Sequence, residues 1–323
     1  MLNQQQYLVC PQCLSELHNL QTQFRCIGCG LFFEIVNNIP RFVPRKNYAE
    51  SFGLQWNQFK RTQIDSEIGS NRSRDRFNEE TQWTKRELEN KLVLDAGCGS
   101  GRFSEIALSL GAYLIAVDFS SAIDAASKNL SGKNTSFIQG DLAKLPIANS
   151  SIDFIYCIGV LQHTSNPEQI IQELLRCLKP GGELALTFYE NSSWHVKFYS
   201  KYLVRPLTKR LPANLLLKII VKTSDFWFPI TSILFRLPSP LGRILRFMIP
   251  IANYVEFEYA NKEDAKDEAI LDTFDMLSPS YDKPIKKNKI RSWISNSGIN
   301  VKELEVRPAR GTLKYIKLAN SFD

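Results

Sequence analysis

A glycine-rich turn near the middle of the chain combines residue types and spacing that could do chemistry. Residues 91–108 read KLVLDAGCGSGRFSEIAL, in which Leu92–Leu94 predict a short buried strand and an amphipathic helix begins near Gly101. Glycines let the backbone approach a ligand closely and tolerate the dihedral angles of such a turn. Because many nucleotide-binding folds use glycines in this way, the turn predicts a ligand site without identifying the ligand.

Asp95 stands between the expected strand and the glycines, and its negative charge limits the kinds of ligand that the turn could bind. A carboxylate just ahead of the turn would repel the pyrophosphate of a dinucleotide. S-adenosylmethionine (SAM) has no phosphate, and its cationic sulfonium and ammonium groups could pair with an acid directly or through water. Asp95 therefore favours SAM over NAD as the ligand.

Carboxylates also follow the next two expected strands. Residues 112–117 predict a strand that ends at Asp118, whose carboxylate could accept hydrogen bonds from both hydroxyls of a ribose. A third strand ends at Ile138, and Asp141 after it could accept a hydrogen bond from an adenine amino group. The other elements expected here are a strand at Ser151–Ile158, a helix at Glu168–Leu178 and a strand at Glu183–Phe188. This alternation of strands and helices predicts a parallel sheet.

As an ordered set, five stretches between about residues 91 and 190 resemble the class I SAM-dependent methyltransferases of the small-molecule type: VLDAGCGSG, VDFS, GDLAKLP, DFIYCIGVLQHT and LKPGG. The resemblance implies that the first of them contacts the methionine part of SAM, the second the ribose and the third the adenine. The cofactor-binding residues that it implies are Asp95, Gly97, Cys98, Gly99, Gly101, Asp118, Phe119, Asp141, Leu142, Ile158 and Gly159. The alternative, that Asp118 and Asp141 are ordinary turn residues, is disfavoured by the order of the set.

Methyl transfer requires mainly that the nucleophile and the methyl group are aligned. A general base is needed only for a poorly acidic hydroxyl or a protonated amine. His163, just past the fourth strand, is the preferred candidate base, although it could instead cap the next helix or contact the cofactor. Asp275, Tyr281 and Asp282 are weaker candidates, because their Ser-Pro loop could equally be a plain lid.

Four of the seven cysteines form two CxxC pairs separated by twelve residues. Two such turns complete a tetrahedral four-thiolate site for zinc, and because four thiolates leave no open position, a structural zinc is favoured over a catalytic one or a redox pair. Gly28 and Gly30 flank the last cysteine, where the backbone often needs a positive φ. The expected metal ligands are Cys10, Cys13, Cys26 and Cys29.

The residues after the second pair extend this site into a small module. Residues 32–42 read FFEIVNNIPRF and predict a strand, an Asn-Asn turn and a proline-stiffened exit. Together with CPxC…CxxCG, over about residues 7–44, they resemble the small zinc-ribbon family that includes activators of methyltransferases. The odd cysteine count and the lack of an export signal at the N-terminus predict a cytoplasmic protein.

Residues 191–260 interrupt the strand-helix alternation with a basic and apolar segment. Between Trp194 and Pro250 there are ten Lys or Arg against one acid, Asp225, which more than accounts for the net charge of +7. No uncharged apolar run is long enough to span a bilayer. The segment could contact an anionic membrane surface, or it could be a helical lid whose basic residues are merely solvated. Contact with nucleic acid is less expected, because such sites are usually richer in polar groups and glycine.

The expected fold is therefore α/β, a Rossmann-like seven-stranded methyltransferase sheet with a helical insertion, preceded by a small zinc ribbon. Its parts are a ribbon at 1–45, a linker or aromatic flap at 46–90, a SAM-binding core at 91–190, the insertion at 191–285, and a helix and β-hairpin at 286–323 that complete the sheet. The hairpin strands are expected at Ile299–Val306 and Thr312–Leu318.

The expected activity is methyl transfer, most simply to oxygen, on a small-molecule or lipid-linked acceptor. The stretches Tyr48–Phe59 and Asp275–Asp282 resemble a bacterial group associated with surface-polysaccharide or lipid-linked metabolism. The alternative is an RNA methyltransferase, because one rRNA methyltransferase family also has a zinc ribbon. That family typically replaces the fourth thiolate with histidine, which this chain does not. The sequence does not specify the acceptor atom or the oligomeric state.

Overall fold

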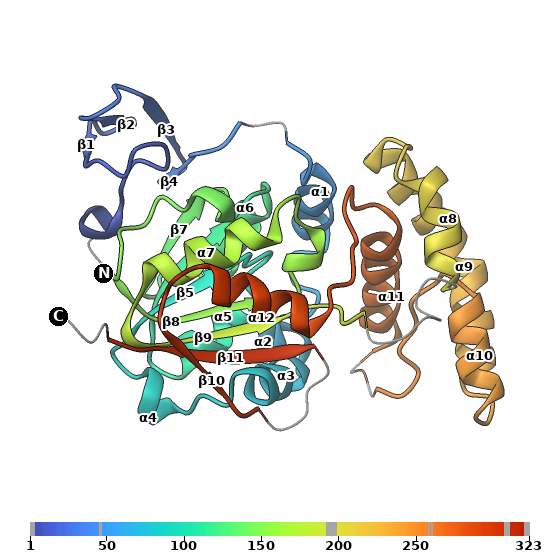
Figure 1. Ribbon diagram of the computed structural model, residues 1–323. Coiled ribbons are helices and arrows are strands. Elements are labelled where there is room, and N and C mark those ends of the chain that lie inside the picture. Colours follow the sequence, from blue (N-terminus) through green and yellow to red (C-terminus); the bar gives the residue numbers. More distant parts are fainter. Residues whose placement is uncertain are drawn as a thin grey trace.

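Seven strands form the central sheet of the computed structural model, in the order β10-β11-β9-β8-β5-β6-β7 (Figure 1). Strands β5 to β9 are parallel, whereas β11 is antiparallel to both of its neighbours. The strands are β5 Leu92–Ala96, β6 Tyr113–Asp118, β7 Thr135–Gln139, β8 Ile152–Ile158, β9 Leu178–Thr187, β10 Val301–Leu304 and β11 Thr312–Lys317. The structure describes residues 4–44, 47–191, 199–257, 259, 261–306 and 311–319. The predicted fold class is confirmed.

Helices cover both faces of this sheet because side chains of successive strand residues point to opposite faces. In β5, Val93 packs in the hydrophobic cluster that contains Ile106, whereas Leu94 packs in the cluster that contains Leu174 and Trp293. The covering helices are α5 Arg102–Ser109 and α6 Ala122–Asn129 on the first face, and α7 Pro167–Cys177 and α12 Lys287–Asn296 on the second. Strand β9 begins at Leu178, five residues before the predicted start, because the KPGG segment continues the strand instead of forming a separate turn.

The N-terminal module is a four-stranded antiparallel sheet that lies beside β7. Its strands are β1 Leu17–Asn19, β2 Gln23–Cys26, β3 Phe32–Val36 and β4 Ile39–Pro40, preceded by the 3-10 helix η1 Gln4–Tyr7. Asn37 and Asn38 both have positive φ and form the predicted turn between β3 and β4. The segment that follows β4 is hydrogen-bonded to the core, because the Phe42 amide donates to the Gln139 carbonyl at 2.8 Å.

Residues 47–90, for which the sequence suggested a linker or aromatic flap, are mostly helical. They contain α1 Glu50–Gln58, α2 Asp65–Ile68, α3 Arg72–Thr81 and α4 Lys85–Leu88. Phe77 and Trp83 are buried against the sheet, so these two aromatics belong to the core and not to a flap. Phe52 and Trp56 of α1 face the ligand cavity described below.

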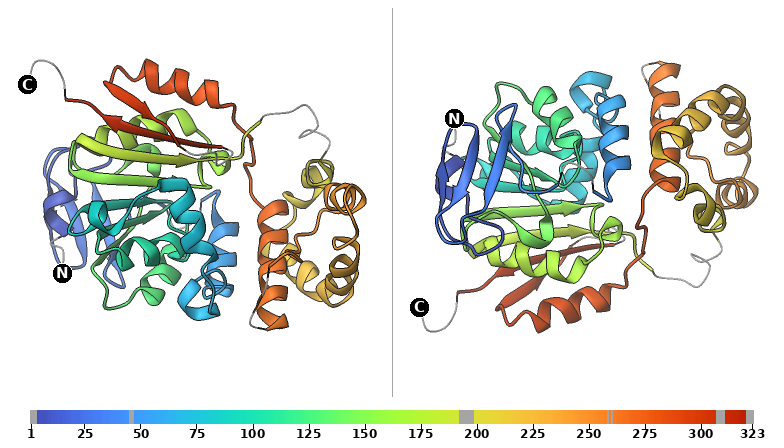
Figure 2. Two further views of the ribbon diagram at one scale, coloured as in Figure 1. Left: turned by 90° about the horizontal axis from the view of Figure 1, so that it is seen from below. Right: turned by 90° about the horizontal axis from the view of Figure 1, so that it is seen from above.

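The insertion between β9 and α12 forms a helical layer at one end of the molecule (Figures 1 and 2). Its helices are α8 Ser200–Thr208, α9 Ala213–Leu234, α10 Leu241–Met248 and α11 Lys262–Leu277. In both figures α11 lies nearest to the sheet, and α8 to α10 lie outside it. Within the described residues, none of the helices combines the length and apolar character that crossing a membrane requires.

Candidate functional site

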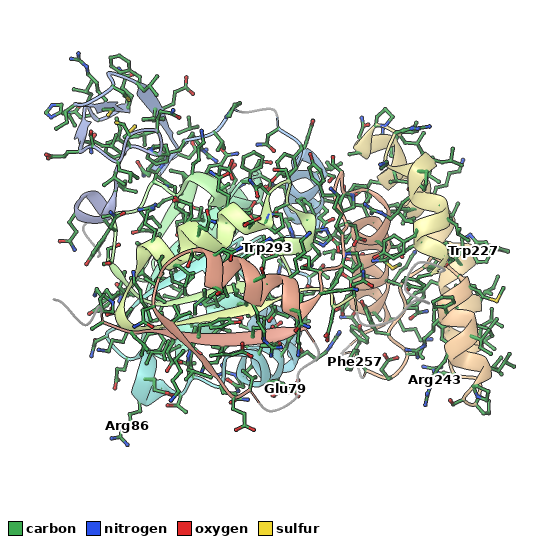
Figure 3. The ribbon with its side chains drawn as sticks, in the orientation of Figure 1. Glu79, Arg86, Trp227, Arg243, Phe257 and Trp293 are labelled. Carbon is green, nitrogen blue, oxygen red and sulfur yellow. The ribbon has the colours of Figure 1, made fainter. Side chains whose placement is uncertain are left out.

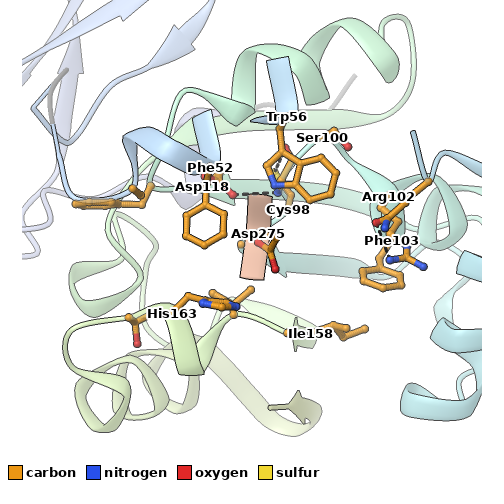
Figure 4. Close-up of a pocket in the computed structure, with 18 of the residues that line it drawn as sticks. Phe52, Trp56, Cys98, Ser100, Arg102, Phe103, Asp118, Ile158, His163 and Asp275 are labelled. Carbon is orange, nitrogen blue, oxygen red and sulfur yellow. Dashed lines mark hydrogen bonds between the residues drawn. The ribbon is translucent and has the colours of Figure 1, made fainter. Parts of the chain in front are cut away.

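A cavity of about 280 Å³ lies at the carboxyl ends of β5, β6 and β8 (Figure 4). Loops after parallel strands meet at this edge, which is where α/β sheets usually bind ligands. The cavity is also lined by α1 and by α11, which come from the predicted linker and from the insertion. Three segments that are far apart in sequence therefore enclose one site.

The glycine turn after β5 forms the floor of the cavity. Gly97 has φ +90°, and a Cβ added there would lie 2.5 Å from the side chain of Val160. Gly99 has φ +55°, and its added Cβ would lie 3.2 Å from the Trp56 ring, which hangs over the turn in Figure 4. Gly101 precedes α5 with φ +93° and shapes the turn without lining the cavity. Side chains at these positions would strain the turn or fill the space beside it.

Asp118, at the end of β6, lines the cavity as predicted, and its carboxylate is held by the surrounding backbone. One oxygen accepts from the Gly99 amide at 2.9 Å, and the other accepts from the amide and hydroxyl of Ser120. Burial raises the pKa of Asp118, and these donated hydrogen bonds oppose that shift. Phe119 also lines the cavity, and its ring stacks on Tyr48 at 4.8 Å between centroids.

Asp95 lies beneath the cavity instead of among the residues that line it. One carboxylate oxygen accepts from the Ser104 hydroxyl at 2.6 Å and from the Tyr156 hydroxyl at 2.8 Å. Burial raises the pKa of Asp95 to about 7. Its observed contacts therefore hold the floor of the site together, and its role toward a ligand stays a prediction.

The remaining predicted cofactor residues come together around the same cavity. Cys98 lies in the turn, with a buried thiol whose pKa burial raises well above its usual value. Asp141 caps a short 3-10 helix, η2 Leu142–Lys144, by accepting from the Ala143 amide at 2.8 Å. The other predicted residues that line the cavity are Leu142, Ile158 and Gly159.

His163 lies in the 3-10 helix η3 Leu161–His163, and its ring lines the cavity between Phe52 and Tyr189. Its Nδ1 is 3.0 Å from the carbonyl oxygen of Tyr281. A carbonyl only accepts, so Nδ1 must carry the proton, and in the neutral ring Nε2 is left as the basic nitrogen. This arrangement gives the histidine the tautomer that a general base requires.

The structure places the three weaker candidates for the general base in different environments. Asp275 lines the cavity and accepts from the Gln55 amide at 3.4 Å. Tyr281 is outside the lining residues, and its ring contacts Tyr48 edge-on. The Asp282 carboxylate is buried and pairs with Lys201 at 2.8 Å, which connects α8 to this loop, and Asp282 is not among the residues that line the cavity.

The sequence reasoning missed several charged or polar residues of the cavity wall. Among them are Arg76 of α3, Arg102 of α5, Asp272 of α11 and Tyr254, which precedes α11. Arg102 directly follows the glycine turn, but its residue type gave no signal, and only the packing of α3 and α11 against the sheet brings it together with the others.

Gln63 links two of these residues, because its side chain accepts from Arg102 and donates to Asp272 at 3.3 Å. Arg102 donates to the Ser73 hydroxyl and to the Gln63 side-chain oxygen, both at 2.8 Å, and burial together with nearby Arg76 lowers its pKa to about 10. The Tyr254 hydroxyl donates to Asp272 at 2.5 Å. Burial, reinforced by neighbouring carboxylates, raises the pKa of Asp272 to about 7.

The side chains that line the cavity carry more carboxylates than guanidinium groups. The carboxylates are Asp118, Asp141, Asp272 and Asp275, and the guanidinium groups are Arg76 and Arg102. Such a lining favours a ligand with a positive centre and a smaller anionic part. It disfavours a pyrophosphate, and the Gly99 amide, which could otherwise bind a phosphate, donates to Asp118.

A second candidate site is formed by the four cysteines of the N-terminal module. Their sulfur atoms lie within 4.8 Å of one another, with Cys13 to Cys26 at 3.4 Å and Cys10 to Cys29 at 3.6 Å. A tetrahedral site with Zn–S bonds of about 2.3 Å needs sulfur separations of about 3.8 Å, so the four thiols fit a zinc ion.

The two glycines beside Cys29 have different roles. Gly30 has the expected positive φ of +74°. Gly28 does not have a positive φ. A side chain would not fit at this position, because an added Cβ would lie 2.3 Å from the Ser15 hydroxyl.

Residues 94–186, less than a third of the chain, match a family model described as a methyltransferase domain. A demethylmenaquinone methyltransferase of Renibacterium salmoninarum is 32% identical over 117 residues, which cover 36% of this chain and 49% of that protein. A ubiquinone biosynthesis O-methyltransferase of Coxiella burnetii is 31% identical, over 35% of this chain and 48% of that protein. A phosphoethanolamine N-methyltransferase of Triticum aestivum is 33% identical, over 38% and 25%. The chain spans no more than about half the length of these relatives.

Solved structures of methyltransferases resemble the chain more distantly. A SAM-dependent methyltransferase from Aquifex aeolicus aligns with 85% of this chain and 100% of its own, at 14% identity and a TM-score of 0.41. A phosphoethanolamine N-methyltransferase of Haemonchus contortus, in complex with phosphoethanolamine and S-adenosylhomocysteine, aligns with 46% and 34%, at 19% identity and a TM-score of 0.35. The matched residues 94–186 contain the glycine turn, Asp118, Asp141 and His163.

Proposed function

We propose that this chain is a SAM-dependent methyltransferase with its cofactor in the cavity at the carboxyl edge of the sheet. One observation carries the proposal: the glycine turn, Asp118 and Asp141 line one cavity within the segment that matches a methyltransferase domain. The excess of carboxylates in that cavity suits the sulfonium cation of SAM.

Different residues of the cavity suit different chemical groups of SAM. Asp118 has lone pairs left to accept from the ribose hydroxyls, and Asp141 can accept from the adenine amino group. Arg76 and Arg102 provide the positive charge that a methionine carboxylate needs, in the half of the cavity shared by α3 and α5. Bound SAM supplies an activated methyl group, so the chain must mainly align the acceptor and exclude water.

His163 is the residue that we propose to remove a proton from the acceptor. Its Nε2 is the basic nitrogen, and the Tyr281 carbonyl keeps the ring in that tautomer. A base of this type suits a hydroxyl acceptor, because a hydroxyl must lose its proton as the new bond to carbon forms. We therefore propose O-methylation.

We propose a small-molecule or lipid-linked acceptor. The names of the relatives include enzymes of quinone biosynthesis and a phosphoethanolamine methyltransferase, which support a small acceptor without specifying it. Aromatic side chains of Phe52, Trp56 and Tyr189 line the cavity and suit an acceptor with an apolar part.

We also propose that the four cysteines hold one structural zinc. Four thiolates close the coordination sphere, so the ion would stabilise the ribbon and take no part in methyl transfer. The ribbon has few buried apolar side chains of its own, and a metal would supply much of its stability.

The first test is binding of SAM and S-adenosylhomocysteine by titration calorimetry. Micromolar binding of both is expected, and no binding of either would contradict the proposal. Radiolabelled SAM is then supplied with lysate of the source organism, and the label is separated into organic, aqueous small-molecule and RNA fractions. Label in the organic fraction supports a lipid-linked acceptor, label in the aqueous fraction a free small molecule, and label in RNA would overturn the proposed acceptor class.

A further inference from the structure

Helix α8 buries its two basic residues and exposes its two leucines. Lys201 pairs with Asp282, and Arg205 donates to the backbone carbonyls of Met276 and Pro279. On the other side of the helix, Leu203 is 70% exposed and Leu207 is 69% exposed. A helix that only covered the cavity would have the opposite orientation, with its leucines inside.

The next two helices also present apolar stripes to solvent. In α9, Ile219, Phe226 and Ile233 are exposed at seven-residue intervals, which places them on one side of the helix. In α10, Leu241, Ile244 and Met248 are exposed, at the i, i+3 and i+7 spacing of one helix face. We call these two stripes and the leucines of α8 the outer face, because they are exposed on the helices that lie farthest from the sheet (Figure 1).

A groove links the outer face to the interior of the insertion. It has a volume of about 500 Å³ and runs between α9, α11 and residues 248–252. Its walls are mostly apolar, and Ile219, Trp227 and Met248 border it while also being exposed to solvent. The outer face is therefore continuous with an apolar groove.

The charges on these three helices are almost all positive. In these helices and the turns that follow them, six exposed basic residues have no carboxylate within ion-pairing distance among the described residues: Lys209, Arg210, Lys218, Lys222, Arg236 and Arg243. The one acid of these helices, Asp225, already pairs with Lys266. Figure 3 shows Trp227 and Arg243 on the outermost helices of the molecule.

We propose that the outer face docks on an anionic lipid bilayer. Unpaired cations attract acidic headgroups, while exposed Leu, Ile, Phe and Met side chains beside them can enter the headgroup and acyl boundary. A nucleic acid would satisfy the cations but leave the aliphatic side chains in water. A second copy of the chain would bring like charges together, which a bilayer of acidic lipids does not.

The test is co-sedimentation of the full chain with vesicles of phosphatidylcholine alone or mixed with phosphatidylglycerol. Binding is expected only to the mixed vesicles, and it should weaken as salt rises because exposed charges are screened. The triple variant K218E/K222E/R243E should lose roughly tenfold or more in partitioning to them. Its matched control is R86E/K91E/K302E, with the same change of net charge at exposed positions elsewhere, and this variant should bind as the wild type does or lose much less.

The apolar contribution is tested separately with F226S/I233S. This variant should also partition roughly tenfold less, while I27S/F32S, which changes two equally exposed apolar residues of the ribbon, should bind as the wild type does. All four variants alter exposed side chains, and far-ultraviolet circular dichroism checks their fold.

Three results would overturn the proposal. They are failure of the wild type to bind the anionic vesicles, equal losses in a variant and its control, and a dimer in solution that F226S/I233S dissociates. Binding to RNA that K218E/K222E/R243E abolishes, without vesicle binding, would reassign the surface to nucleic acid. The outer face is separate from the cofactor cavity, so these results do not depend on whether SAM binds.

Discussion

At the scale of single residues, the cavity depends on side chains that are held in place before any ligand arrives. Asp118 is oriented by three donated hydrogen bonds, and His163 is oriented by the Tyr281 carbonyl. Such preorganisation lowers the cost of ordering these groups when a ligand binds. Substitutions at the two positions should therefore affect ligand binding and catalysis separately.

Asp118→Asn is expected to weaken SAM binding about tenfold or more. An asparagine would lose the negative charge that holds ribose hydroxyls, and its amide hydrogens would face the Gly99 or Ser120 amides, which are also donors. Calorimetric titration with SAM measures the change. Glu79→Gln, an exposed substitution on α3, is the control, and equal affinities in the two variants would remove Asp118 from the cofactor site.

His163→Gln is expected to lower the methyl-transfer rate about 10²- to 10⁴-fold, as loss of a general base does. Because the change should spare the ribose and adenine contacts, SAM affinity should stay within about twofold. Single-turnover rates with the labelled acceptor fraction, measured across pH, distinguish the two effects. An unchanged rate would show that His163 only packs against Phe52 and Tyr189.

At the scale of the elements, α11 forms both a wall of the cavity and the support for the outer helices. Asp272 and Asp275 face the cavity, whereas Ile270 and Leu277 of the same helix line the apolar groove. The acidic side also binds α3, because Arg72 pairs with Glu268 at 2.5 Å. One helix therefore joins the ligand site to the surface that we propose for lipid contact.

In the ligand-free protein, the contribution of Asp272 to stability should fall as pH rises from about 4 to about 7. Burial raises the pKa of Asp272 to about 7, whereas the unfolded side chain titrates near 4. Between these values the folded state keeps a proton that the unfolded state has released, so the free energy of unfolding decreases with pH. Asp272→Asn removes this contribution.

Urea unfolding at several pH values tests the expectation for Asp272. The stability of Asp272→Asn relative to the wild type should rise up to about pH 7 and then stay level. Asp75→Asn, an exposed substitution on α3, is the control. Parallel pH profiles for the wild type and Asp272→Asn would contradict the raised pKa.

The purified chain is expected to contain one zinc per molecule, measured by atomic emission. Removal by a strong chelator, or Cys10→Ser, should unfold the ribbon, because Cys10 is buried and is one of the four proposed ligands. Loss of protection from hydrogen exchange at residues 8–40, with the sheet of the core unchanged, would be the signature. Cys177→Ser, a buried cysteine outside the cluster, should keep the metal.

At the scale of the whole molecule, the ribbon, the core sheet and the insertion are joined at two places, the edge of β7 and the cavity. The ribbon docks on the core through backbone hydrogen bonds from Val9 and Phe42. Arg41 adds side-chain contacts to Asp124 at 2.6 Å and to Gln139 at 3.0 Å. Tyr48, just beyond the ribbon in the sequence, stacks on Phe119 at the wall of the cavity. The ribbon is thus attached close to the proposed cofactor site.

Arg41→Ala is expected to loosen the ribbon from the core and to destabilise the docked state by about 1–3 kcal/mol. The partly buried Asp124 carboxylate and the Gln139 side chain would lose their donor. Faster proteolysis between the ribbon and α1, compared with Arg25→Ala on the ribbon's own surface, measures the loosening. Equal cleavage rates would mean that the backbone contacts alone hold the ribbon.

From the sequence alone we could predict the parallel sheet, the motifs that follow its successive strands, and the cluster of four cysteines. These features are local, because a glycine turn, a strand-end carboxylate and a CxxC pair each need a few consecutive residues in a set conformation. Asp118, Asp141 and His163 could be found in this way, and they do line one cavity.

Only the tertiary structure decided what covers the ligand and what faces outward. Arg76, Arg102 and Asp272 are far apart in the chain and share no motif, and the packing of α3 and α11 brings them together. Similarly, periodicity predicts that Leu203 and Leu207 share one face of a helix, but not that this face points to solvent. On the inward side of α8, Lys201 pairs with Asp282, which lies 81 positions away in the chain, so this orientation accompanies a long-range contact that no local pattern encodes.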